Sequence, residues 1–454
     1  MLTHIVHYVL RLALWVFFRN IDVRGRDKVP VGGPLIYVAN HPNVMMDPLI
    51  IGLNTPGQVP HFLGKGTLFN YRLFAWFLRK SGVIAVARVQ DKGTRMSSNR
   101  DMLRAAYQVL GRGEALAIFP EGISHAHMRV HELEPGVARI ALKAESEQED
   151  GAGVHIVPIG LTYSDPGTFR SDVDVHFGQS IAVRPFVKSD RESRRASEQE
   201  LTGRIHEGLT ALTPHVKDTD LETTIRDLSE IYADEVMVQL PESEQFGKRL
   251  RAHQEIIRGV NHFSEAEPEL LRSFATVLRA HHQELRRLGL GGESVLRPRA
   301  PLRPQKLLLA VLLSPLALYG FIHNAVPYYI PRLLARPYRQ VPEMIATIKM
   351  LTGAGLFMVW YAILMGAAWI LAGSLTAVLY GISLPLSGLF VLAYDERIVQ
   401  RSPFWQGRFL GRGSRRKQLR RMSEERAAII RQLDVLRDRY LAQTSPPHPS
   451  SDPD

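Results

Sequence analysis

The chain has 454 residues, a length that predicts two or three structural units rather than one. It contains no cysteine, which excludes disulfides, thiolate metal ligands and a cysteine nucleophile. Its formal net charge of +11 predicts an anionic partner. Because no nucleic-acid-binding motif is present and the basic residues flank apolar segments, we expect that partner to be a membrane surface and not a nucleic acid.

Residues 1–20 predict an apolar helix that carries Arg11 within it and Arg19 near its end. The stretch is too short and too interrupted to be a membrane span. We expect an interfacial helix that lies on the bilayer, with a helix packed on the following domain as the alternative. No small-residue cleavage site follows, which argues against a secretion signal.

Residues 21–185 alternate short apolar runs with helical patterns, which predicts an α/β domain. The predicted strands are Leu35–Ala39, Val83–Ala87, Ala115–Phe119, His155–Leu161 and Val173–Phe177. The predicted helices are Ser98–Leu110 and Gly136–Lys143. Periodicity leaves the order of the strands open.

Residues 186–290 are polar, and their periodicity predicts a helical insert with a structural role. Ser264 and Glu267, followed by Pro268, have the pattern of a helix start, and Gly289 predicts the stop of that helix. The glycines and prolines of residues 291–305 predict a linker.

The longest apolar segments lie in residues 306–396. Leu351–Ala372 and Leu375–Tyr394 each have about 20 residues without a charge, which is enough to cross a bilayer. Because only Gly373 and Ser374 separate them, they predict a C-terminal transmembrane helical hairpin.

The segment Leu307–Ile322 is interrupted by Pro315 and predicts a re-entrant or interfacial segment. Basic residues stand on both sides of the hairpin, and positive flanks belong on the cytoplasmic side. We therefore expect an integral membrane protein whose α/β domain is cytoplasmic. Residues 397–444 predict a basic helical tail that binds anionic headgroups, with a solvated amphipathic helix as the alternative, and residues 445–454 predict disorder.

The segment Asn40–Pro48 follows a predicted strand and holds His41 and Asp47. A carboxylate near a histidine can hold the imidazole in one tautomer and stabilise its charged form. Such a pair can act as a general base on a hydroxyl, which raises a rate by roughly 10²–10⁴. No serine lies in a nucleophile-elbow pattern, which favours direct transfer to an acceptor over a covalent intermediate.

A second segment, Phe119-Pro120-Glu121-Gly122, ends another predicted strand. Glycine permits a tight turn and the close approach of backbone amides to a ligand. Taken alone, this segment is better interpreted as a structural turn.

Together these segments resemble the glycerolipid acyltransferase family, which includes glycerol-3-phosphate and 1-acylglycerol-3-phosphate acyltransferases. Four blocks match in order over about residues 15–185. They are Asn40-His41 with Asp47, then Phe62-Leu63-Gly64-Lys65-Gly66 leading to Val83–Ala87 and Arg88, then Phe119-Pro120-Glu121-Gly122, and finally Val157-Pro158-Ile159.

The resemblance implies that His41 removes the proton of an acceptor hydroxyl and that Asp47 orients His41. The hydroxyl then attacks the thioester of acyl-CoA or of acyl-carrier protein. No cofactor beyond this acyl donor is implied. The expected partners are membrane lipid, the acyl donor and a glycerol phosphate or lysophospholipid acceptor, and the number of subunits stays open.

The resemblance also implies binding residues. Arg88 would bind the acceptor phosphate, with Glu121 and Gly122 shaping that site, because a guanidinium offers a phosphate two parallel hydrogen bonds. A surface salt bridge is the structural alternative for Arg88. Lys65 is a further phosphate candidate, and Pro158 would line the acyl donor region.

Two departures from the common family pattern are informative. Five residues separate His41 from Asp47 where four are usual, and Ile123-Ser124-His125 follows Gly122 where Thr-Arg often stands. Both departures resemble the fungal-type glycerol-3-phosphate/dihydroxyacetone-phosphate acyltransferase branch, which also carries C-terminal membrane segments. They favour glycerol-3-phosphate as the acceptor, with 1-acylglycerol-3-phosphate as the alternative.

Three other interpretations are weaker. His125 and His127 could ligate a metal, but no carboxylate or cysteine cluster stands near them, so we expect no metal site. An inactive membrane scaffold is disfavoured because His41, Asp47 and Glu121 are all present. A transporter is disfavoured because the predicted hairpin carries no intramembrane charge.

Overall fold

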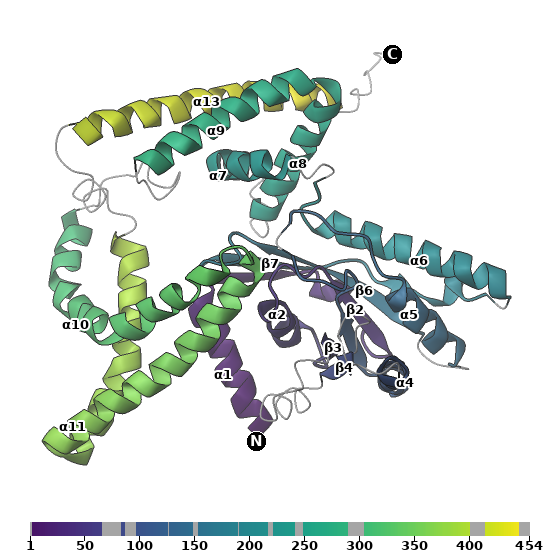
Figure 1. Ribbon diagram of the computed structural model, residues 1–454, viewed down its shortest axis with the longest axis horizontal. Helices are drawn as coiled ribbons and strands as arrows, with labels where there is room; N and C mark the ends of the chain where they lie inside the picture. The colour runs from purple at the N-terminus through teal and green to yellow at the C-terminus, as the bar shows by residue number, and fades with distance from the viewer. Residues whose placement is uncertain are drawn as a thin grey trace, which may run out of the picture. The chain divides into compact units, whose positions relative to one another are not determined.

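A computed structural model describes most of the chain (Figure 1). The described residues are 2–65, 83–86, 97–125, 127–148, 153–188, 190–216, 221–240, 248–288, 304–399 and 414–444. They form two compact units. The first comprises Met1–His215, Glu244–Leu250 and Ala335–Met350, and the second comprises Val216–Ser243, Arg251–Leu334 and Leu351–Asp454.

The first unit is built on one mixed sheet. Its described strands are β1 (Asn20–Arg24), β2 (Leu35–Ala39), β3 (His61–Lys65), β4 (Ile84–Val86), β5 (Ala115–Ile118), β6 (His155–Tyr163), β7 (Asp172–Phe177) and β8 (Ile181–Ala182). They run in the order β1-β7-β6-β2-β5-β3-β4, with β8 paired to β6. Neighbours are parallel except where β6 meets β7 and β8.

All five predicted strands are present, although Ala87 lies outside the described residues. The α4 (Ser97–Gly111) and α5 (Gly136–Ser146) helices confirm the two predicted helices. β1 was not predicted, because it has only two apolar residues, Ile21 and Val23, among polar and charged ones at the edge of the sheet. Charged side chains are usual on edge strands, where they discourage pairing with another chain.

Helices cover both faces of this sheet (Figure 1). On one face, α1 (Leu2–Phe17) and α2 (Met46–Asn54) pack against the side chains of Tyr37 and Ala39. On the other face, α4, α5 and α6 (Arg191–Leu212) pack against Ile36 and Val38. The side chains of β2 therefore alternate between two apolar cores, as expected for a central strand that is buried on both sides.

The α/β unit extends past the predicted boundary at residue 185, because α6 packs on β6. Two glycines allow this close approach. A Cβ at Gly160 would lie 2.5 Å from the carbonyl oxygen of Leu212, and one at Gly208 would lie 2.8 Å from Cγ of Pro158. Any larger residue at either position would push α6 away from the sheet.

The N-terminal helix α1 packs on the domain through one face and exposes another. Leu14 and Phe17 are buried in the core, as the alternative interpretation expected. Its exposed apolar side chains are Tyr8, Val9, Leu12 and Trp15. The interfacial position on a bilayer stays a prediction, and this exposed apolar face is the part of α1 that suits it.

The second unit contains a group of polar helices. They are α7 (Glu222–Gln239), α8 (Lys248–Ala266), α9 (Pro268–Arg287) and α13 (Ser414–Thr444). Side-chain bonds join α13 to the others: the Tyr232 hydroxyl donates to Asp434 at 2.6 Å, and Arg437 donates to Glu255 at 2.7 Å. Much of the predicted basic tail is therefore a packed helix, while residues 400–413 and 445–454 lie outside the described residues.

The predicted start of a helix at Pro268 is confirmed, but the expected capping role of Ser264 is wrong. Ser264 lies inside α8, where its hydroxyl donates to the carbonyl of Asn261, and α9 begins at Pro268 with Glu267 as its N-cap. Proline is favoured at a first helical position because its missing N–H has no partner there in any case. Gly289 and residues 291–303 of the predicted linker lie outside the described residues.

The predicted interruption at Pro315 is also wrong, because α10 (Pro304–Leu334) continues through it. A proline inside a helix removes the N–H that would bond the carbonyl four residues earlier, here that of Val311. The hydroxyl of Ser314 donates to this carbonyl at 2.8 Å. The helix can therefore run on without leaving a backbone acceptor unpaired.

The α11 helix (Pro342–Tyr394) is interrupted at Gly373, whose φ of 84° and ψ of 176° are not helical. A Cβ at Gly381 would lie 2.7 Å from Cε of Met365, so the segments before and after Gly373 lie side by side as a hairpin. By length and composition, Leu307–Tyr338 and Pro342–Ile398 are each able to cross a membrane. The exposed side chains of these helices are largely apolar.

A side chain of the α11 hairpin replaces the hydrogen bond that Pro327 removes from α10. Pro327 leaves the carbonyl of His323 without its helical partner. The indole Nε1–H of Trp360, in α11, donates to that carbonyl at 2.8 Å. Regular helix at this point of α10 thus depends on a side chain from a neighbouring helix, as is common for prolines in apolar bundles.

Candidate active site

The site lies where three neighbouring parallel strands end. The register pairs Ala39 of β2 with Ile159 of β6, and Val38 of β2 with Ile118 of β5. The residues that follow these strands therefore meet at one edge of the sheet. This edge, at the carboxyl ends of the strands, is where open α/β sheets usually bind ligands.

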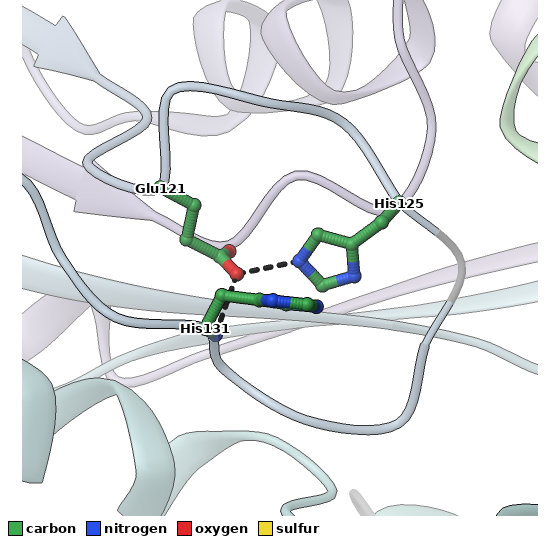
Figure 2. A group of neighbouring side chains, drawn as sticks. All are labelled: Glu121, His125 and His131. Carbon is green, nitrogen blue, oxygen red and sulfur yellow. Dashed lines mark hydrogen bonds and ion pairs between the residues drawn. The ribbon is translucent and has the colours of Figure 1, made fainter. Parts of the chain in front are cut away.

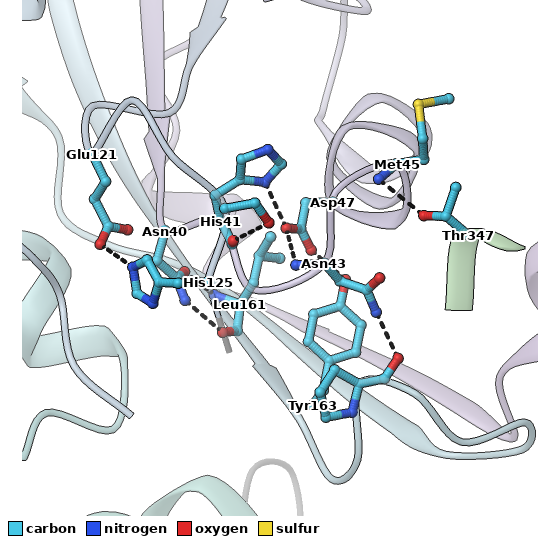
Figure 3. A network of polar contacts seen from close by, with 12 residues as sticks. Asn40, His41, Asn43, Met45, Asp47, Glu121, His125, Leu161, Tyr163 and Thr347 are labelled. Carbon is cyan, nitrogen blue, oxygen red and sulfur yellow. Dashed lines mark hydrogen bonds and ion pairs between the residues drawn. The ribbon is translucent and has the colours of Figure 1, made fainter. Parts of the chain in front are cut away.

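His41 and Asp47 come together as predicted (Figure 3). Nδ1 of His41 lies 2.8 Å from Oδ2 of Asp47. The chain turns between them because the N–H groups of Met46 and Asp47 donate to the carbonyl of Asn43, which starts α2. A carboxylate can only accept, so this contact places a proton on Nδ1 and leaves Nε2 of a neutral His41 as an acceptor.

Asp47 is fully buried and accepts three hydrogen bonds. Besides His41, the backbone N–H of Asn43 donates to Oδ2 at 2.7 Å, and the hydroxyl of Tyr163 donates to Oδ1 at 2.5 Å. Both carboxylate oxygens therefore have partners. A buried carboxylate that is satisfied in this way can hold an imidazole in one orientation.

Tyr163 is the functional residue that the sequence did not predict. It ends β6, on the same face as Val157, Ile159 and Leu161, so the strand's alternation aims it at the core beside α2. Burial, followed by the nearby Asp47, raises the pKa of Tyr163 well above its ordinary value. It therefore stays a neutral donor to Asp47. Alternation could have indicated its face, but not that β6 lies next to β2.

The ring of His41 is held on a second side by Phe119. The two rings are stacked, with centroids 3.9 Å apart and an angle of 12° between their planes. The backbone carbonyl of His41 accepts from the Ser124 hydroxyl at 2.8 Å and from the N–H of His125 at 3.1 Å. Within the described residues, Nε2 of His41 has no hydrogen-bond partner, which leaves it available to a substrate.

Neighbouring asparagines fix the backbone around the pair. The Asn40 side chain both donates to and accepts from the backbone of Leu161, at 2.9 and 2.8 Å. Asn43 donates to the carbonyl of Pro166 at 2.8 Å, and the N–H of Met45 donates to the Thr347 hydroxyl at 3.3 Å (Figure 3). These bonds tie the turn that carries His41 to segments distant in sequence.

Glu121 and Gly122 form the turn after β5. Gly122 has a φ of 70°, a conformation that favours glycine, and its N–H donates to the carbonyl of Phe119. The Glu121 carboxylate is buried and its Oε2 accepts from Nε2 of His125 at 2.5 Å and from the N–H of His131 at 2.8 Å. Glu121 therefore holds the loop that follows it.

The expectation that no carboxylate lies near the loop histidines was wrong. The turn at Gly122 brings Glu121 onto His125, and the loop then returns His131 to the same place (Figure 2). Together Glu121, His125 and His131 form a group that could hold a metal ion. Burial, followed by the charges of His125 and Arg129, lowers the pKa of His131.

For the other predicted binding residues, no contact with His41 is seen among the residues that the structure describes. Arg88 lies outside the described residues. Lys65 ends β3, where its backbone pairs with Val86. Pro158 packs against Gly208 of α6, on the sheet face opposite to the core that holds Phe119 and Tyr163. Its predicted role at the acyl donor stays a prediction.

Comparison with known proteins places this domain. Residues 20–162 match the Acyltransferase family model. An uncharacterized acyltransferase of Schizosaccharomyces pombe is 24% identical over 63% of this chain and 54% of that protein. Glycerol-3-phosphate O-acyltransferase 1 of Saccharomyces cerevisiae is 30% identical over 30% of this chain and 18% of that protein. The 1-acyl-sn-glycerol-3-phosphate acyltransferase of Streptococcus pneumoniae is 27% identical over 40% of this chain and 63% of that protein.

The chain thus spans less than two thirds of the length of each of these relatives. The matched region contains β1, β2, His41, Asp47, Glu121 and nearly all of β6, so it includes the pair of His41 and Asp47 described above. Residues 20–162 thus form an acyltransferase domain by their match to the Acyltransferase family model.

Proposed function

We propose that this chain transfers an acyl group from a thioester donor, acyl-CoA or acyl-carrier protein, to a hydroxyl of glycerol-3-phosphate. The observation that carries the proposal is the pair of His41 and Asp47. Nδ1 of His41 is bonded to a buried carboxylate that accepts three hydrogen bonds, and Nε2 has no hydrogen-bond partner among the described residues. A base held in this way can act on a hydroxyl without itself forming a covalent bond to the acyl group.

The proposed reaction has two steps at His41. Nε2 takes the proton of the acceptor hydroxyl while the oxygen attacks the thioester carbonyl carbon, and Asp47 stabilises the resulting imidazolium. The tetrahedral intermediate then collapses, the carbon–sulfur bond breaks, and the thiolate takes the proton back from Nε2. His41 returns to its neutral form, so no other residue has to supply or remove a proton.

The choice of acceptor rests on two departures of this sequence from the common family pattern and on the relatives of the chain. The five-residue gap between His41 and Asp47 and the Ser124-His125 pair favour the fungal-type branch, and two glycerol-3-phosphate O-acyltransferases of Saccharomyces cerevisiae are among the relatives. The match to a 1-acyl-sn-glycerol-3-phosphate acyltransferase favours a second candidate, transfer to 1-acylglycerol-3-phosphate. Arg88 and Lys65 remain the proposed phosphate ligands.

A membrane location suits both substrate and product, and we propose that α10 and α11 anchor the chain with its acyltransferase domain in the cytoplasm. Each methylene of an acyl chain that leaves water contributes about 0.8 kcal/mol. Transfer next to a bilayer therefore avoids exposing the acyl chain to water. The length and apolar composition of these helices support the proposal.

The test is acyl transfer by membranes containing the wild type, His41→Ala or His262→Ala, with labelled glycerol-3-phosphate and 1-acylglycerol-3-phosphate offered separately. His262 lies in α8 and bonds Gln443, so it is a matched control far from the proposed chemistry in sequence. We expect labelled lysophosphatidate from the first acceptor, retained in His262→Ala and reduced by roughly 10²–10⁴ in His41→Ala.

Other outcomes would change the proposal in defined ways. Product from 1-acylglycerol-3-phosphate alone would assign the second candidate function. No transfer to either acceptor with either donor class would contradict glycerolipid acyl transfer. Full activity of His41→Ala would remove His41 from the mechanism.

A further inference from the structure

A second cluster of titratable groups lies in the loop after β5. Glu121, His125 and His131 each offer one ligand atom, and these atoms all lie within 4.8 Å of one another (Figure 2). The proposed acyl transfer uses none of the three as an acid or base. The family resemblance gives Glu121 a part in shaping the acceptor site, but the proposed function leaves the approach of His125 and His131 to Glu121 unexplained.

Three polar atoms of this cluster lack hydrogen bonds. Oε1 of Glu121, Nδ1 of His125 and Nε2 of His131 are buried and have no hydrogen-bond partner among the residues that the structure describes. The side chain of Glu121 is 0% exposed and that of His125 is 9% exposed. A buried polar atom without a partner costs about 1–3 kcal/mol, so one such group calls for an explanation and three on neighbouring side chains call for a common one.

We propose that Glu121, His125 and His131 bind a divalent metal ion, with Zn²⁺ as the best match. Two imidazoles and one carboxylate form a ligand set that Zn²⁺ takes when one position is left to water. Mg²⁺ and Ca²⁺ favour sites made of oxygen ligands, which the two histidines do not provide. The chain has no cysteine, so histidine and carboxylate are the zinc ligands it has.

The neighbouring bonds suit this role. Oε2 of Glu121 is already held by the N–H of His131, which fixes the carboxylate and leaves Oε1 for the ion. The centroids of the His125 and His131 rings are 4.1 Å apart, so the two rings are close enough to bind one ion. Backbone donors that orient a ligating carboxylate are a usual part of metal sites.

The ion would act on the active site through the loop. Ser124 and His125 both donate to the backbone carbonyl of His41, so an ion that fixes this loop also fixes the backbone of His41. Its role is structural, and the acyl transfer proposed above does not route through it. The metal site does not rest on that function and can be tested without substrate.

His127 provides a matched control. Its ring centroid lies 5.7 Å from that of His125 and 5.8 Å from that of His131, but it is not a member of the ligand group. A change at His127 alters the same loop and removes the same type of side chain. It should therefore leave the metal site intact.

The test is Zn²⁺ binding by the full chain in detergent, purified without an oligohistidine tag and stripped of metal. Wild type, His131→Gln and His127→Gln are dialysed against buffered Zn²⁺, and bound zinc is measured by mass spectrometry. We expect one ion per chain in wild type and in His127→Gln, and binding at least tenfold weaker in His131→Gln, since removing a ligand or its support typically costs 10–100-fold in affinity.

A spectroscopic measurement on wild type keeps the test independent of the variants' folding. Co²⁺ at this site should give the intense visible bands of a four- or five-coordinate ion, not the weak bands of the hydrated ion, and Zn²⁺ should displace it. The proposal is overturned by Co²⁺ spectra of the hydrated ion alone, by no bound zinc in wild type, or by equal loss of zinc in both variants.

Discussion

Two buried carboxylates in the first unit each contact a histidine, yet their surroundings differ. Asp47 accepts from His41, from the Asn43 N–H and from Tyr163, so both of its oxygens have partners. Glu121 uses Oε2 for both of its hydrogen bonds, and its Oε1 has none. The carboxylate of the first network is satisfied without a ligand and only Nε2 of His41 is left for a substrate, whereas the second network has unpaired atoms on all three of its side chains.

The difference separates two tasks that the same residue types can perform. A closed network fixes a base in one tautomer and orientation, as catalysis by a histidine requires. An open network keeps polar atoms available at the cost of leaving them unpaired, which suits an incoming ion. The contrast therefore predicts that changes around Asp47 mainly affect rate, while changes around Glu121 affect metal binding and stability.

Asp47→Asn should have the largest effect on rate. The amide nitrogen would meet one of the donors that now face Asp47, and His41 would lose the partner that fixes its tautomer. We expect the rate at saturating substrate to fall by on the order of 10²–10⁴. The measurement is steady-state transfer, with Asp172→Asn, a carboxylate paired to Arg19, as control. An unchanged rate would mean that His41 acts without Asp47.

Glu121→Gln should abolish stabilisation by zinc. Free zinc at 100 times its dissociation constant should raise the free energy of unfolding of the wild type by about 2.7 kcal/mol. The amide lacks the charge that attracts the ion, so Glu121→Gln should unfold at the same temperature with and without zinc. Thermal unfolding in detergent measures this. An equal zinc-dependent rise in both proteins would place the ion elsewhere.

Tyr163→Phe should have a smaller effect on both rate and stability. It removes one of three donors from Asp47 and leaves Oδ1 buried without a partner, which costs about 1–3 kcal/mol. We expect a several-fold fall in the rate at saturating substrate with little change in KM, because Tyr163 acts through its hydrogen bond to Asp47. Tyr8→Phe, at an exposed position of α1, is the control. A change confined to KM would contradict this positioning role.

Tyr37→Phe should have the smallest effect, visible mainly at high pH. The Tyr37 hydroxyl is buried without a partner, and burial raises the pKa of Tyr37 to about 12. Below pH 10 neither the folded nor the unfolded chain ionises at this residue. Between pH 10 and about 12 the unfolded chain ionises first, so the wild type loses stability as the pH rises.

Tyr37→Phe removes the loss of folding stability that ionisation of Tyr37 causes at high pH. At pH 7 the substitution should be neutral or slightly stabilising, because it deletes an unpaired buried hydroxyl. Unfolding of both proteins across pH 8–11.5 measures the difference. Parallel curves for the two proteins would show that ionisation of Tyr37 is not coupled to folding.

The pattern of the sequence was sufficient for the strand cores and for the pairing of His41 with Asp47. Both depend on short spacings: alternation or apolar runs within a strand, and a single turn between two residues. Tyr163 and the position of Glu121 among the histidines depend on which strands are neighbours and on how a loop returns. Such contacts are set by packing between distant segments, which one chain's periodicity does not encode.

The wrong expectation at Pro315 has a similar cause. From the sequence, a proline in an apolar stretch predicts a break, since it removes a backbone hydrogen bond. Whether another donor replaces that bond depends on local rotamers, and here Ser314 supplies it from the preceding position. A serine or threonine beside a helix proline is therefore a signal that argues against a break.

The bond from Trp360 to the carbonyl of His323 has a consequence for biogenesis. During synthesis His323 emerges well before Trp360, and in a water-free surrounding its carbonyl has no other donor in place of the one that Pro327 lacks. That turn of α10 completes its hydrogen bonding only when the first arm of the hairpin has been made and has docked. Under the proposed membrane location, the insertion of these helices is ordered, because the hairpin completes the hydrogen bonding of the helix that precedes it.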